Sequence, residues 1–183
     1  MKLDPNAFLT EKKLIDYLRL IFPNEIWTSN RKIPGSSINS RPDYYNDKLK
    51  IIIEFDGDST ANLKGHYSNA ETILKDYKKD KVYKEIGLKV IRIPYFVQMS
   101  IDSIHDLFGI EGIKVEQVYP HGFWNKDAKL PVDYNELGIS RFENDLIRLP
   151  SIRNDIIDSL KTKITEFGNI DLVLPGKLRY LIL

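Results

Sequence analysis

The stretch that most constrains the fold is "IIIEFDG", residues 51–57. Side chains along a β-strand point alternately to opposite faces, so three consecutive isoleucines place apolar groups on both faces. A strand of this kind is expected inside a sheet that other elements cover on both sides. Two carboxylates, Glu54 and Asp56, follow the isoleucines at once, where the strand leaves the core.

The neighbouring segments predict the elements around this strand. Regularly spaced apolar residues predict an amphipathic helix over 9–22, and the turn-forming "NDKL" predicts that 41–45 and 50–56 form a hairpin. A second helix is expected over 70–85, and "KVIRIPYF", residues 89–96, has the composition of another strand. The order helix, strand, strand, helix, strand predicts an α/β fold with a mixed sheet.

The second half of the chain is predicted to be mostly helical. Short helices are expected over 100–109 and 130–138, and a longer one over 151–168, where apolar residues recur along one stripe. We therefore expect a core over residues 1–100 and a helical extension over 101–183 that packs on it. Such an extension would serve specificity or oligomerisation.

The composition excludes several classes of protein. At 183 residues and 42% hydrophobic, the chain can form one well-packed core. It contains no cysteine, so disulfides, thiolate catalysis and cysteine-bound zinc are excluded, and a metal would have only oxygen or imidazole ligands. Charges interrupt the apolar runs near the N-terminus and elsewhere, which predicts a soluble, cytoplasmic protein without membrane contact.

The carboxylates around the hairpin suggest a metal site. Glu54 and Asp56 share one face of their strand because side chains alternate. If "NDKL" is a four-residue loop, Tyr45 pairs with Lys50, which places Asp43 on the same face and diagonally next to Glu54. Carboxylates that close repel one another unless a cation lies between them, and oxygen ligands suit Mg²⁺, Mn²⁺ or Ca²⁺. The alternative is an acidic, solvated face of the sheet.

A second charged feature is "LKDYKKDKVYKE", residues 74–85, which holds five lysines. The chain as a whole has a net charge of only +1, but residues 1–100 hold 17 basic and 13 acidic side chains, and 101–183 hold 10 and 13. Two interpretations stay open. The lysines form either a solvated helix face or a stripe that faces a polyanion.

Taken together, "RPD", "IIIEFDG", "GHY" and "DYKKDKVYKEIGLKVIRIP" resemble the PD-(D/E)XK nuclease superfamily. The resemblance is to the branch that includes the very-short-patch-repair endonucleases and other small restriction-like proteins, and it covers about half of the chain. It implies a restriction-endonuclease-like fold, in which helices flank a mixed central sheet.

The resemblance also implies roles for individual residues. Asp43 and Glu54 match the residues that hold Mg²⁺, for which Mn²⁺ can substitute, and Glu11 matches an acidic residue of the first helix that often completes the site. Asp56 stands where most members have a lysine, and as a catalytic residue it is expected to help position or deprotonate the attacking water. His66, which follows an inserted loop, matches a histidine that acts as a general base or orients the attacking water.

These observations predict an endonuclease that hydrolyses DNA with the help of Mg²⁺, as in restriction, nicking or repair. RNA as the substrate and a homodimeric state are left open. The alternatives are a non-catalytic module that binds nucleic acid or protein, and a metal-dependent enzyme acting on another phosphate ester. In the nuclease hypothesis the lysines of the second helix contact backbone phosphates. These are Lys75, Lys78, Lys79, Lys81 and Lys84.

Overall fold

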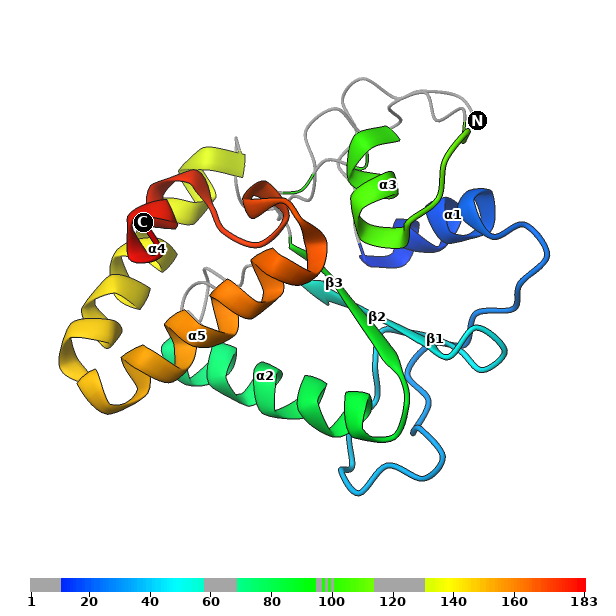
Figure 1. Ribbon diagram of the computed structural model, residues 1–183, viewed down its shortest axis with the longest axis horizontal. Helices are drawn as coiled ribbons and strands as arrows, with labels where there is room; N and C mark the ends of the chain where they lie inside the picture. The colour runs from blue at the N-terminus through cyan, green and yellow to red at the C-terminus, as the bar shows by residue number, and fades with distance from the viewer. Residues whose placement is uncertain (1–10, 58–68, 95–96, 98, 100, 114–130) are drawn as a thin grey trace.

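A computed structural model describes residues 11–57, 69–94, 97, 99, 101–113 and 131–183 (Figure 1). In chain order its main elements are α1 (Glu11–Ile21), β1 (Tyr44–Asn46), β2 (Ile51–Asp56), α2 (Ala70–Glu85), β3 (Lys89–Pro94), α3 (Ile101–Phe108), α4 (Pro131–Arg148) and α5 (Pro150–Phe167), followed by two 3₁₀ turns, η2 (Ile170–Leu172) and η3 (Gly176–Leu181). The predicted mixed α/β class and the predicted order of helices and strands are confirmed.

The sheet has three strands in the order β1-β2-β3. β1 pairs with β2 in antiparallel fashion, and β2 pairs with β3 in parallel fashion through the connecting helix α2. A parallel pair requires such a crossover, which explains why a long helical segment separates the two apolar strands in the sequence. The sheet is therefore mixed, as predicted, and helices flank it.

The predicted register of the hairpin is wrong by two residues. Tyr45 pairs with Ile52 instead of Lys50, and Asn46 belongs to β1 instead of the loop. The loop closes differently because the Asn46 side chain accepts a hydrogen bond from the Leu49 amide at 2.7 Å, and Lys50 adopts a left-handed backbone with φ of 57°. A shift of two residues keeps the faces unchanged.

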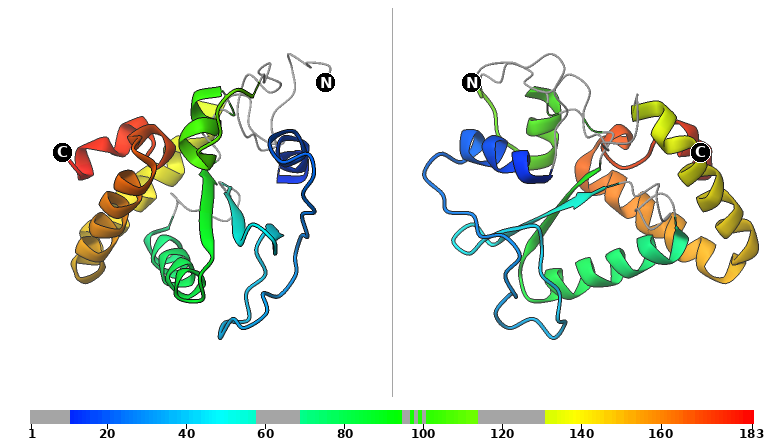
Figure 2. Two further views of the ribbon diagram at one scale, coloured as in Figure 1. Left: turned by 45° about the vertical axis from the view of Figure 1, so that its right-hand side comes forward. Right: turned by 180° about the vertical axis from the view of Figure 1, so that it is seen from behind.

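The two faces of the sheet are covered by different helices. Figure 2 shows the sheet between α1 on one side and α2 with α5 on the other. On the α1 side, Leu14 and Leu18 belong to the same buried cluster as Ile53. On the α2 side, Tyr83 is buried with Ile52. Both faces of β2 are thus covered, as its isoleucines predicted.

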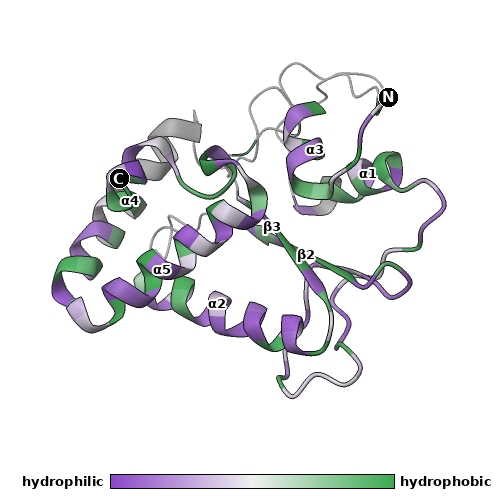
Figure 3. Ribbon diagram, in the orientation of Figure 1, coloured by the Kyte–Doolittle hydropathy of each residue, from purple (hydrophilic) through white to green (hydrophobic). Residues whose placement is uncertain are grey.

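Helix α2 differs from the other helices in its polarity. It is largely hydrophilic in Figure 3, whereas β2 and β3 are largely hydrophobic. Its buried residues include Ile73 and Tyr83 but also Asp80, so its sheet-facing side is partly charged. An apolar stripe is consequently missing from the sequence of this helix. Its start is fixed by Asn69, whose side chain accepts hydrogen bonds from the amides of Glu71 and Thr72.

The helices after residue 100 share the core of the earlier elements. Helix α5 packs against α2 and α4, and its Leu160 lies in the same apolar cluster as Leu14 of α1. The predicted end of a helix at Gly138 is wrong, because α4 continues to Arg148. Among the described residues, no helix combines the length and apolarity needed to cross a membrane.

Candidate functional site

The candidate site is a charged layer on the α2 side of the sheet. Near the start of β2 and β3, this face carries one apolar cluster that includes Tyr45, Ile52 and Val90. The next position of β2 on the same face is Glu54, and its register partner on β3 is Arg92. The switch from apolar to charged residues therefore occurs within a single step of two residues along each strand.

Asp43 lies opposite Glu54 at the end of the hairpin. The pairing of Tyr44 with Ile53 directs the preceding residue, Asp43, toward Glu54 in the antiparallel arrangement. The Asp43 carboxylate is fixed there, because its Oδ2 accepts a hydrogen bond from the Phe55 amide at 2.6 Å. The two-residue shift of the register thus brings Asp43 directly across from Glu54 instead of diagonally next to it.

Both carboxyl groups have raised pKa values. Burial raises the pKa of Asp43 to about 6, and the nearby carboxylate of Glu11 acts in the same direction. Burial likewise raises the pKa of Glu54 to about 7, and Asp43 adds to the effect, although Lys79 and Arg92 oppose it. Placing negative charge on this pair is therefore costly, and a bound cation would reduce the cost.

Lys79 of α2 is the cation closest to Glu54 in this layer. Its Nζ lies 2.9 Å from Oε1 of Glu54, and its side chain is 20% exposed. Burial by itself would lower the pKa of Lys79, but the Glu54 carboxylate outweighs it and the pKa is raised. Lys79 is therefore a fixed positive charge and a hydrogen-bond donor at neutral pH.

The sequence analysis assigned Lys79 to a phosphate-binding stripe, whereas the structure turns it toward Glu54. The sequence feature that could have indicated this orientation of Lys79 is Tyr83, a buried aromatic residue one helical turn later. Residues four apart lie on the same side of a helix, so Lys79 faces the sheet together with Tyr83.

Arg92 organises the other half of the charged layer. It donates to Asp80 through two hydrogen bonds, from Nε at 2.9 Å and from Nη2 at 2.8 Å, and it pairs with Asp56 through Nη1. Lys163 of α5 lies 2.8 Å from the same Asp80 carboxylate. The side chains of Arg92, Asp56 and Asp80 are at most 5% exposed. We call these four residues the Arg92 network.

The cations of the Arg92 network compensate the buried negative charges of Asp56 and Asp80. Burial by itself would raise the pKa of Asp80, but Arg92 and Lys163 lower it to about 2. Likewise, Asp56 and Asp80 hold the pKa of the buried Arg92 far above its usual value. Asp56 is thus held by Arg92, an arrangement that favours a structural role for it over proton transfer. The sequence pattern did not indicate Arg92 or Lys163 as members of this network.

The other predicted acidic and histidine residues are placed as follows. Glu11 is the first residue of α1, exposed, and its carbonyl accepts a hydrogen bond from the Tyr44 hydroxyl at 2.9 Å. Its carboxylate influences the pKa of Asp43, yet the described part of the chain has no group of three or more acidic or histidine side chains arranged to hold a metal ion. His66 lies outside the described residues.

The five predicted phosphate-binding lysines divide into two sets. Lys79 pairs with Glu54, and Lys84 pairs with Glu166 of α5. The remaining three, Lys75, Lys78 and Lys81, are exposed on α2. These three have the open position that contact with an extended polyanion requires, whereas Lys84, also exposed, is held by Glu166.

Asp43 and Glu54 fit a site for Mg²⁺ or Mn²⁺. They offer only oxygen atoms and are partly or fully buried. Burial raises both pKa values, and a nearby carboxylate adds to the effect, Glu11 for Asp43 and Asp43 for Glu54. Magnesium commonly uses one or two protein carboxylates and completes its coordination with water and substrate phosphates. Two carboxylates at the end of a sheet therefore meet the requirement without a third protein ligand.

Comparison with known proteins identifies no relative. No protein-family model matches the chain, and no curated protein or solved structure matches it significantly.

Proposed function

We propose that the chain is a divalent-metal-dependent endonuclease that hydrolyses phosphodiester bonds of DNA. The observation that carries the proposal is a pair of carboxylates, half-buried Asp43 and buried Glu54, opposite each other with the Lys79 ammonium 2.9 Å from Glu54. Two acidic groups with raised pKa values beside a fixed cation are a combination suited to phosphate chemistry.

The residues of the chain have distinct tasks in this proposal. Asp43 and Glu54 would hold Mg²⁺, which when bound polarises the phosphate and acidifies water. Lys79 stays protonated, so it donates a hydrogen bond to a phosphate oxygen or to the attacking water and does not act as a base. In the reaction the attacking water gives up a proton to the solvent as its oxygen bonds to phosphorus, the bond to the leaving sugar oxygen breaks, and that oxygen takes up a proton from the solvent.

The fold supports the same proposal. A first helix, a hairpin that carries the two carboxylates, a crossover helix and a parallel strand follow one another in the order that the sequence patterns predict. Helices flank the mixed sheet, so we propose a restriction-endonuclease-like core. The exposed lysines Lys75, Lys78 and Lys81 on α2 supply a surface for the DNA backbone.

The direct test incubates purified protein with plasmid and labelled duplex in the presence of Mg²⁺, Mn²⁺ or EDTA. We expect cleavage with either metal and none with EDTA. Glu54→Gln and Asp43→Asn should each lower the rate by roughly 1,000-fold, about 4 kcal/mol, because each removes a charge that the metal requires.

The matched control is Glu71→Gln, which removes a carboxylate from the first turn of the same helix that carries Lys79. Glu71 is exposed, so this variant should cleave like the unsubstituted protein. Equal activity of Glu54→Gln and Glu71→Gln would refute the assignment of the site.

A second candidate function is a non-catalytic nucleic-acid-binding module with the same fold. Ion pairs neutralise Glu54 and Asp56, through Lys79 and Arg92, which favours this alternative because these carboxylates then need no metal. The alternative predicts DNA binding that EDTA does not alter and no cleavage with any metal. The plasmid assay together with a binding measurement separates the two.

A further inference from the structure

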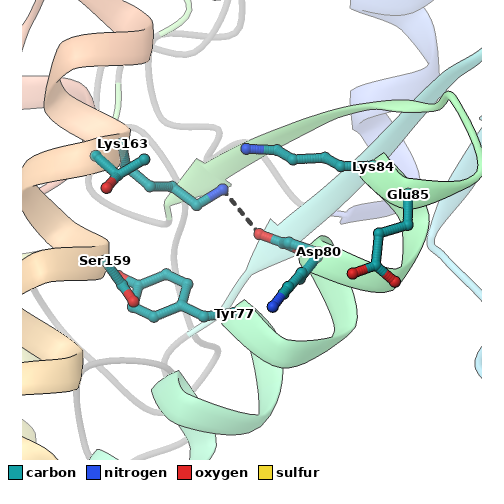
Figure 4. A pocket seen from close by; sticks show the side chains of 8 residues that line it. Tyr77, Asp80, Lys84, Glu85, Ser159 and Lys163 are labelled. Carbon is teal, nitrogen blue, oxygen red and sulfur yellow. Dashed lines mark ion pairs between the residues drawn. The ribbon is translucent and has the colours of Figure 1, made fainter.

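The C-terminal helix α5 reaches the charged layer through one side chain. Lys163 is 6% exposed, and its Nζ lies 2.8 Å from Oδ2 of Asp80 (Figure 4). The ammonium also lies 5.9 Å from the ring centre of Tyr77, which supplies a favourable cation–π contact. Lys163 is thus a buried charge placed by α5 against a carboxylate of α2.

Asp80 in turn restrains Arg92. Both oxygens of Asp80 accept hydrogen bonds from the guanidinium, and two parallel bonds of this kind fix its plane. Arg92 pairs with Glu54 in the register of the sheet and holds Asp56, two residues along the strand from Glu54. A chain of direct contacts therefore runs from Lys163 through Asp80 and Arg92 to Asp56.

We propose that Lys163 is a positioning residue for the candidate site. By sharing Asp80 with Arg92, it keeps the guanidinium oriented toward Asp56 and holds the end of β2 in the geometry that Asp43 and Glu54 need. This inference rests on the proposed nuclease function. It also means that the helical extension, expected above to serve specificity or oligomerisation, would help to position residues of the candidate site.

The experiment compares two ion pairs that join the same two helices. Lys163→Met removes the ammonium that contacts Asp80, and Lys84→Met removes the pair of Lys84 with Glu166, which does not touch the Arg92 network. Lys163→Met should lower kcat by roughly 10- to 100-fold with KM for DNA changed by less than about twofold, the usual size of an outer-shell effect. Lys84→Met should leave both constants nearly unchanged, and Lys163→Arg should restore most of kcat.

A second measurement does not depend on activity. The Nε–H signal of Arg92 in an NMR spectrum reports its bond to Asp80 directly. In Lys163→Met we expect this proton to exchange with water at least about tenfold faster than in Lys84→Met, because Asp80 is then held from one side only. An unchanged Arg92 signal in Lys163→Met, or equal losses of kcat in both variants, would overturn the inference.

Chemical rescue uses the space beside Lys163. A pocket of about 480 Å³ opens between α2 and α5, and Tyr77, Asp80 and Lys163 are among its lining residues. Methylammonium should therefore enter the site of a Lys163→Ala variant and raise its kcat several-fold, whereas added potassium at equal ionic strength should not. Failure of rescue with a folded Lys163→Ala protein counts against the inference. The proposed function itself fails separately, if the unsubstituted protein cleaves no DNA.

Discussion

The charged layer contains two groups of carboxylates whose pKa values are shifted in opposite directions. Asp43 and Glu54 have pKa values raised to about 6 and about 7, whereas the pKa of Asp80, in the Arg92 network, is lowered to about 2. All three lie on the same side of one small sheet. The difference is therefore one of partners. Among the described residues, Asp80 has two cations at hydrogen-bond distance, Glu54 has one, Lys79, and Asp43 accepts its hydrogen bond from the Phe55 amide.

The two groups therefore differ in how their charges affect the stability of the fold. Buried charges that are fully paired are tolerated by a fold, and removing one partner leaves an uncompensated charge. Carboxylates that burial and neighbouring carboxylates drive toward protonation contribute nothing comparable to stability at neutral pH, so their presence needs another reason. In the proposed function, a divalent cation would supply that reason for Asp43 and Glu54.

The largest effect is expected from Arg92→Met. The substitution leaves Asp56 and Asp80 buried without the guanidinium that satisfies both, which should lower the free energy of unfolding by roughly 3 to 5 kcal/mol. Denaturant unfolding measures the loss. Arg19→Met is the matched control, because Arg19 is 69% exposed and its pair with Asp16 should contribute less than about 1 kcal/mol. Equal losses in both variants would show that the Arg92 network is not a stabilising unit.

The pH dependence of stability should distinguish the two groups. The folded protein binds the Glu54 proton more tightly than the unfolded chain does, since the pKa rises from 4.5 to about 7. The resulting stabilisation is complete below pH 4.5 and is lost as the pH rises through 7, so the metal-free protein should lose on the order of 1 to 3 kcal/mol over this window. Asp43, shifted from 3.8 to about 6, adds a loss of the same sign.

Asp80 acts in the opposite direction. Its pKa falls from 3.8 in the unfolded chain to about 2, so its contribution is present above pH 3.8 and disappears as the pH falls through 2. In Glu54→Gln the decline between pH 4.5 and 7 should become shallower, while the acid limb set by Asp80 should stay. Unfolding curves at several pH values in EDTA measure both limbs, and an identical neutral limb in Glu54→Gln would contradict the assignment.

Metal binding should reverse the loss at neutral pH. At a Mg²⁺ concentration ten times its Kd, linkage predicts a stabilisation of about 1.4 kcal/mol, seen as a higher Tm in Mg²⁺ than in EDTA. The shift should be larger at pH 8 than at pH 6, because the metal competes with the protons on Asp43 and Glu54. Glu71→Gln should keep the shift and Glu54→Gln should lose it. A shift that survives Glu54→Gln would place the metal elsewhere.

The sequence could predict those features of the fold and the site that follow from local backbone geometry. Apolar periodicity located α1, α5 and the buried strand β2, because side-chain spacing follows directly from backbone geometry. Alternation along β2 also placed Glu54 and Asp56 on one face, and Asp43 joined them despite the wrong register, because a shift of two residues keeps the face. These features depend on local geometry alone.

The partners of the carboxylates could not be predicted in this way. Lys79 comes from α2, Arg92 from β3 and Lys163 from α5, so each pairing depends on how distant elements pack. Helix α2 was the hardest case, since it buries Asp80 where an amphipathic pattern would have an apolar residue. The helix that runs through Gly138 shows the same limit, because packing can override the weak helical propensity of glycine.

The smallest effect concerns the exposed lysines of α2, which the structure separates from the charged layer. Replacing Lys75, Lys78 and Lys81 by alanine should weaken binding to every DNA sequence alike, because interactions with phosphates carry no sequence information. The slope of log K against log salt should fall by up to about 0.9 for each phosphate that the variant no longer neutralises.

The control for this variant removes three exposed lysines from other elements, Lys32, Lys89 and Lys161. It changes the net charge equally, so any difference between the two variants reports local binding of phosphate instead of long-range attraction. Dissociation constants at several salt concentrations give both slopes. Parallel lines for the two triple variants would mean that α2 faces water and that DNA reaches Asp43 and Glu54 from another side, whereas a shallower line for the α2 variant alone places the backbone along this helix.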